Sequence, residues 1–108
     1  MLDQVTPPQN VIDCLQTILD AIASNNYELF TTVGNSSYQA NITRQMFEGV
    51  SEQLSSRMVK GYTTTYFGDL KQLDYQIYLW KLSFEDDGDE FVIRMTMDGD
   101  KVAGILIE

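Results

Sequence analysis

The side chains of this chain that could carry out chemistry are carboxylates and phenols. Its 108 residues include 16 Asp and Glu and 6 Tyr, but no histidine and a single cysteine. A cysteine nucleophile needs a neighbouring base, usually histidine. Cys14 also falls within a helical apolar pattern, so we expect a buried, unreactive thiol. No zinc-ligand spacing, phosphate-binding glycine loop or nucleophile elbow occurs, and the sequence therefore predicts no metal site and no cofactor.

Carboxylates are concentrated in one short segment, residues 85–90, which reads EDDGDE. An EF-hand calcium loop places its ligands at fixed offsets, ends on a bidentate glutamate and lies between two helices. No helical pattern flanks this segment. We therefore interpret it as the acidic tip of a hairpin and not as a calcium site.

Composition restricts the class of partner. The formal net charge is −9, which repels phosphate groups and disfavours both nucleic acid and anionic membranes. Apolar residues make up 44% of the chain and charged residues 21%, as in an ordinary globular domain, and we expect one domain over residues 1–108. The N-terminal MLDQVTPPQN has no apolar leader, and no run reaches membrane-spanning length, so a cytoplasmic protein is expected.

The first half of the sequence has helical patterns. Thr6 is predicted to cap a first helix, and Asn26 a short second helix over 27–33 that Gly34 ends. Residues 35–41 are predicted to form a polar loop, followed by a third helix. Thr43 caps this helix, which carries Phe47 on its apolar side. The apolar residues on one face of the first helix are Val11, Ile12, Leu15, Ile18, Leu19 and Ile22.

The second half alternates with a period of two, which is typical of strands. Strand-like runs lie near 60–67, 71–84, 90–97 and 100–107. The predicted turns between them are Gly68-Asp69, Asp87-Gly88 and Asp98-Gly99. Helices followed by an antiparallel meander predict an α+β, cone-like domain, in which three N-terminal helices pack on a curved antiparallel sheet of about four strands.

The predicted turns also assign faces to the side chains. Two-residue turns at Asp87-Gly88 and Asp98-Gly99 place one apolar set on the helix side of the sheet. This set is Tyr78, Trp80, Leu82, Phe84, Phe91, Ile93, Met95, Met97, Val102 and Leu106. On the opposite face this register sets Lys81 directly across from Arg94. We expect that face to pair with a second copy of the chain through Lys81, Arg94, Ile105 and Ile107.

The order of these elements resembles the cone-shaped, cystatin-like α+β superfamily named after nuclear transport factor 2. The segments that carry the resemblance are AIASNNYELFTTV (21–33) and MTMDGDKVAGILIE (95–108). Ketosteroid isomerase and polyketide-cyclase-like proteins belong to the same superfamily. The resemblance implies a sheet that curls around the helices, an apolar pocket inside the cone, and dimers joined through the outer sheet face.

The resemblance also suggests where a site could lie. Dehydratase and cyclase members use His–Asp pairs, which this chain lacks. An isomerase-like site would need a carboxylate base beside a tyrosine donor, and the candidates are Asp74 with Tyr62 or Tyr66. The residues predicted to line a pocket for an apolar small molecule are Tyr78, Trp80, Met95, Met97 and Phe47.

These features favour a non-catalytic domain that binds a small ligand or another protein and forms a homodimer through its sheet. One alternative is a small lyase or isomerase acting on an apolar compound in the cone. Another is a purely structural dimerisation module with a filled interior. A buried carboxylate beside a tyrosine would favour the enzyme, whereas an apolar cavity of roughly 300 Å3 or more would favour ligand binding.

Overall fold

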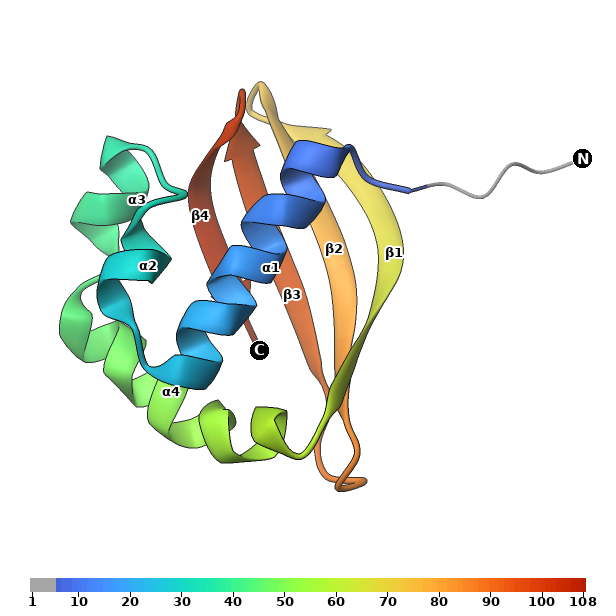
Figure 1. The fold of residues 1–108 in the computed structure, drawn as a ribbon. Coiled ribbons are helices and arrows are strands. Elements are labelled where there is room, and N and C mark those ends of the chain that lie inside the picture. Colours follow the sequence, from blue (N-terminus) through green and yellow to red (C-terminus); the bar gives the residue numbers. More distant parts are fainter. Residues whose placement is uncertain (1–5) are drawn as a thin grey trace, which may run out of the picture.

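The structure is a computed structural model that describes residues 6–108; the first five residues of the N-terminal segment discussed above lie outside it. Four helices precede a sheet of four antiparallel strands, so the α+β class is confirmed and the helix count of three is wrong (Figure 1). The elements are α1 (Gln9–Ser24), α2 (Tyr27–Thr31), α3 (Ser36–Asn41), α4 (Arg44–Val59), β1 (Tyr62–Gln72), β2 (Tyr75–Phe84), β3 (Phe91–Asp98) and β4 (Lys101–Ile107).

Polar caps fix where two of these helices begin. The Asn26 side chain accepts from the Leu29 N–H at 3.0 Å, and the Thr43 hydroxyl accepts from the Met46 N–H at 3.2 Å, which confirms both predicted caps. The prediction for Thr6 is wrong, because α1 starts after Pro8 with no side-chain cap.

The segment predicted to be a polar loop contains α3. The Asn35 side chain caps it by accepting from the Tyr38 N–H at 3.0 Å. Tyr38 is buried, and its hydroxyl donates to the Phe30 carbonyl oxygen at 2.8 Å. Capping and one buried aromatic ring thus turn a polar stretch into a helix.

The sheet has the strand order β1-β2-β3-β4 and is covered by helices on one face. Figure 1 shows α1 crossing the sheet, with α2, α3 and α4 on the same side. Side chains of α1 and α4 form a single core with the inward side chains of the strands. We call the uncovered side of the sheet the outer face.

The first hairpin turns later than predicted. Leu73 and Asp74 form its turn, with φ values of 52° and 67°, so the predicted Gly68-Asp69 turn is wrong. Gly68 lies within β1, opposite Leu79, just after a register shift that leaves Phe67 without a partner. This β-bulge turns Asp69 toward the helix side, opposite Tyr78.

The second hairpin has a longer connection than a two-residue turn. Leu82 is opposite Phe91, so the predicted pair of Phe84 with Phe91 is wrong by two residues, although the assigned faces are unchanged. The cause lies in α4, from which Arg57 bonds both carboxylate oxygens of Asp86 at 2.8 and 3.0 Å. These bonds, together with the Gly88 N–H, lower the pKa of Asp86 to about 2.

The third hairpin differs from the prediction, and this difference changes which β4 side chains lie on the outer face. Asp98 pairs with Lys101, so the turn residues are Gly99 and Asp100 and not Asp98-Gly99. A second bulge at Ala103 then reverses the alternation along the rest of β4. In consequence the side chains of β4 beyond the bulge lie on the faces opposite to those predicted: Ile105 and Ile107 contact the core, whereas Leu106 is on the outer face.

Among residues 6–108, no helix combines the length and the apolar character needed to cross a bilayer.

Two glycines provide a matched test of this packing. A Cβ at position 34 would overlap the ring of Tyr38, whereas a Cβ at position 49, within α4, would meet no atom within 4 Å. We expect Gly34→Ala to lower the free energy of unfolding by about 1–3 kcal/mol through overpacking. Gly49→Ala should raise it by about 1 kcal/mol through helix propensity. Urea denaturation measures both, and equal effects would contradict the described position of Tyr38.

Candidate functional site

The bulge in β1 creates a cluster of polar side chains at one end of the domain. The Tyr66 hydroxyl donates to Asp69 Oδ1 at 3.4 Å, and Gln76 donates its side-chain N–H to Asp69 Oδ2. Tyr78 lies opposite Asp69 across the sheet. The cluster therefore places one carboxylate among two phenols and an amide.

Both phenols of this cluster are held in the neutral form. Burial, and then the negative charge of Asp69, raise the pKa of Tyr66 to about 12. The same two causes raise the pKa of Tyr78. Asp69 itself is exposed to solvent. The tyrosines can therefore donate hydrogen bonds, but the carboxylate is not shielded inside the cone as an isomerase-type base would be.

The predicted catalytic residues are not brought together. Asp74 is exposed in the turn of the first hairpin, and Tyr66 bonds Asp69 instead. The hydroxyl of Tyr62 accepts from the side chain of Gln16 at 3.3 Å. Tyr66 thus pairs with Asp69 and not with the predicted Asp74, because the bulge in β1 turns Asp69 toward the helix side.

The five predicted pocket residues are all buried, but they contribute to different parts of the interior. Met95 lies in the core. Trp80 lines a hollow beside the start of α1. Tyr78 and Met97 line a polar pocket of about 300 Å3 that also contains Asp74. Of the five, only Phe47 borders the largely apolar groove described next.

An apolar groove of about 150 Å3 separates α4 from β4. The residues that line it come from α1, α2, the α3–α4 connection, α4 and β4, and they include Leu106, whose side chain lies on the outer face. They are Ile22, Phe30, Ile42, Met46, Phe47, Val50, Ile105, Leu106 and Ile107. The sequence pattern identified Phe47, but it did not place the rest together, because the β4 bulge decides which isoleucines border the groove.

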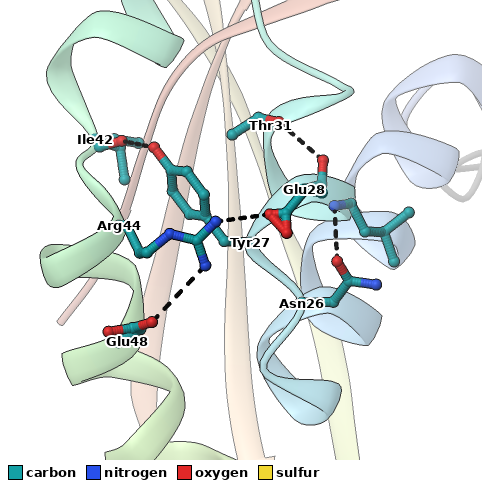
Figure 2. A network of polar contacts seen from close by, with 8 residues as sticks. Asn26, Tyr27, Glu28, Thr31, Ile42, Arg44 and Glu48 are labelled. Carbon is teal, nitrogen blue, oxygen red and sulfur yellow. Dashed lines mark hydrogen bonds and ion pairs between the residues drawn. The ribbon is translucent and has the colours of Figure 1, made fainter.

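A polar network lies next to Ile42, one of the residues that line this groove (Figure 2). The Tyr27 hydroxyl donates to the Ile42 carbonyl oxygen at 2.8 Å, just before α4 begins. Arg44 lies 4.8 Å above the centre of the Tyr27 ring, and it pairs with Glu28 at 2.8 Å and with Glu48 at 3.9 Å. These contacts tie α2 to the start of α4.

The residues predicted for the dimer face are divided between the two sides of the sheet. Lys81 and Arg94 are on the outer face, whereas Ile105 and Ile107 are on the helix side. Lys81 is opposite Val92 and not opposite Arg94 as predicted, because the hairpin is offset by two residues.

Other chemistry has little support among the described residues. Within 6–108, no three His, Cys, Asp or Glu side chains come close enough to hold a metal ion. Burial, and then the charge of Asp13, raise the pKa of Cys14, which disfavours its thiolate form.

Comparison with known proteins leaves the family open. No protein-family model matches the chain. No curated protein matches it either. Among solved structures, the chain is similar to an uncharacterised cystatin-fold protein from Novosphingobium aromaticivorans. The two share 11% identity with a TM-score of 0.44, over 94% of this chain and 99% of that one.

The tyrosine–carboxylate cluster predicts a defined pH response. The folded pKa of Tyr66, about 12, lies above its ordinary value of 10.0, so its contribution to stability is present below pH 10.0 and is lost as pH rises toward 12. Asp69→Asn removes a charge that opposes ionisation, and we expect the Tyr66 pKa to fall.

Ultraviolet absorbance of tyrosinate during an alkaline titration measures this pKa. Subtracting the titration of Tyr66→Phe, on the wild-type and on the Asp69→Asn background, isolates the signal of Tyr66. An unchanged Tyr66 titration in Asp69→Asn would show that the two groups do not interact.

Proposed function

We propose that this chain is a non-catalytic protein-interaction domain that forms a homodimer through the outer face of its sheet. We further propose that it is a small member of the nuclear transport factor 2-like superfamily. The order of helices before an antiparallel meander, with the helices on one face only, supports this assignment.

The observation that carries the dimer proposal is an apolar cluster on a sheet face without a covering layer. Ile77 is only 4% exposed, yet it lies outside the core beneath the helices. Val92 and Leu106 remain 39% and 49% exposed on the same face. An antiparallel sheet with one solvated face ordinarily carries polar side chains there, so several apolar side chains on this face favour a covered surface.

Charge on this face favours a second copy as the partner. The central pairs of the outer face are Leu79 with Arg94, Arg94 with Leu106, and Lys81 with Val92, and the carboxylate of Glu108 lies at the edge of this face, opposite Val92. Two chains that each carry a charge of −9 repel least through a surface whose central charges, here Lys81 and Arg94, are positive.

The geometry gives less support to the alternatives. The apolar groove has a volume of about 150 Å3. Small-molecule pockets usually have a volume of about 300 Å3 or more, twice that of the groove. The carboxylate beside Tyr66 is exposed, and Asp74 is exposed as well, whereas the isomerase hypothesis requires a shielded base. A purely structural dimerisation module would form the same dimer through the outer face, but it would have no further surface for binding another protein.

Substitution of one outer-face residue tests the dimer. Val92→Glu places a carboxylate in the apolar cluster, and we expect it to convert a dimer into a monomer in sedimentation experiments at micromolar concentration. Val59→Glu is the matched control, because Val59 is 78% exposed at the end of α4, away from the outer face. This variant should remain dimeric.

Either of two outcomes would overturn the proposal. One is a wild-type protein that sediments as a monomer of 12.3 kDa. The other is a dimer that Val92→Glu leaves as stable as Val59→Glu does. Native mass spectrometry of the same samples gives the stoichiometry independently.

A further inference from the structure

The edge of β4 that points away from β3 is only partly covered by other backbone. β4 lies at one side of the sheet, with β3 as its neighbour (Figure 1). Near its start, Val102 donates to the Val33 carbonyl oxygen and accepts from the Asn35 N–H, both at 2.9 Å. The connection between α2 and α3 therefore covers the first half of the edge.

The second half of the edge has free main-chain groups. Val92 and Glu108 exchange hydrogen bonds of 2.9 and 3.0 Å, which shows that Glu108 directs its N–H and C=O at β3. Because these groups alternate along an antiparallel strand, Leu106 also faces β3, whereas Ile105 and Ile107 direct theirs away from the sheet. Within residues 6–108, no other backbone group pairs with them.

The apolar groove lies alongside this free edge. Ile105 and Ile107 border it from β4, while Met46 and Val50 border it from α4. An extended chain placed beside β4 would thus find main-chain partners on one side and apolar contacts for alternate side chains on the other. That combination is how sheets accept an added strand from another protein.

The edge lacks the usual protection against such pairing. Natural edge strands carry lysine, proline or an inward-pointing charge at exposed positions. From Val102 to Ile107 the strand reads VAGILI, and its charged neighbours Lys101 and Glu108 lie only at its two ends. An unprotected apolar edge of this kind favours a binding role.

Charge around the groove indicates which segment would fit. Arg44, two residues from the groove residues Ile42 and Met46, is shared by two carboxylates, Glu28 and Glu48. Two carboxylates against one guanidinium leave a net negative charge beside the groove. This acidic surround disfavours a second copy of a chain with a charge of −9 and favours a basic partner.

We infer that the edge from Ile105 to Ile107 and the adjoining groove bind an extended segment of another protein. The segment would add a strand beside β4, with apolar side chains at alternate positions and Lys or Arg on its flanks. This surface is separate from the proposed dimer face, and the inference does not depend on the homodimer.

Selection from a phage-displayed library of random peptides tests the inference. We expect enriched peptides to show alternating apolar residues with basic flanks. Their affinity should fall about tenfold or more for Met46→Glu, which places a charge in the groove. Met46 is 56% exposed, so this variant should still fold, as circular dichroism can verify. Val59→Glu on the same helix should bind the peptides normally.

A second pair of variants tests the main-chain bonds. Ile107→Pro removes an N–H that faces away from β3, so the sheet should persist while peptide affinity falls about tenfold. Ile107→Val keeps that N–H and should bind as the wild type does. Peptide binding should also slow hydrogen exchange at the amides of Ile105 and Ile107.

Three results would overturn the inference. The first is a selection that enriches no peptide more strongly on the wild type than on Met46→Glu. The second is binding that survives both Ile107→Pro and N-methylation of the peptide, which would indicate an apolar groove without strand addition. The third is protection of the Ile105 and Ile107 amides that rises with protein concentration in the absence of peptide, which would assign the edge to a second copy.

Discussion

Two unpaired bulge residues in the sheet, Phe67 and Ala103, determine which side chains this domain presents to a partner. Successive side chains of a strand point to opposite faces, so one unpaired residue reverses every position beyond it until the strand ends. In β1 the bulge at Phe67 turns Asp69 toward the helix side, next to Tyr66. In β4 the bulge at Ala103 turns Ile105 and Ile107 toward the core and leaves Leu106 on the outer face.

A few buried or partly buried hydrogen bonds join the helices around the groove. The Ser51 hydroxyl donates to the Ile22 carbonyl oxygen at 2.7 Å and fixes α4 against α1. The hydroxyls of Tyr27 and Tyr38 bond carbonyl oxygens at the ends of neighbouring segments, both at 2.8 Å. Such buried hydrogen bonds are costly to break, because the partner would be left without a bond. The Ser51 bond joins α4 to α1, whereas the two tyrosine bonds join α2 to α3 and to the start of α4.

Two surfaces with different chemistry result from this arrangement. The outer face joins apolar side chains to Lys81 and Arg94, which suits a flat, extensive contact with another folded surface. The groove joins free main-chain groups to apolar side chains within an acidic surround, which suits a single extended chain. An interaction domain with both surfaces could form a dimer and still bind another protein, because the two surfaces lie on different sides of β4.

The sequence by itself determined the class of the domain and most of its interior. Apolar periodicity placed α1, and the capping residues Asn26 and Thr43 placed the starts of two other helices, because these signals act within a few residues. Alternation with a period of two assigned the inward side chains of β2 and β3, since an offset of two residues preserves the face. Only the tertiary structure decided the turns, the bulges and the site. Arg57 reaches Asp86 from a distant helix, and each bulge is a shift in how one strand matches its neighbour, which a pattern within a single strand does not show.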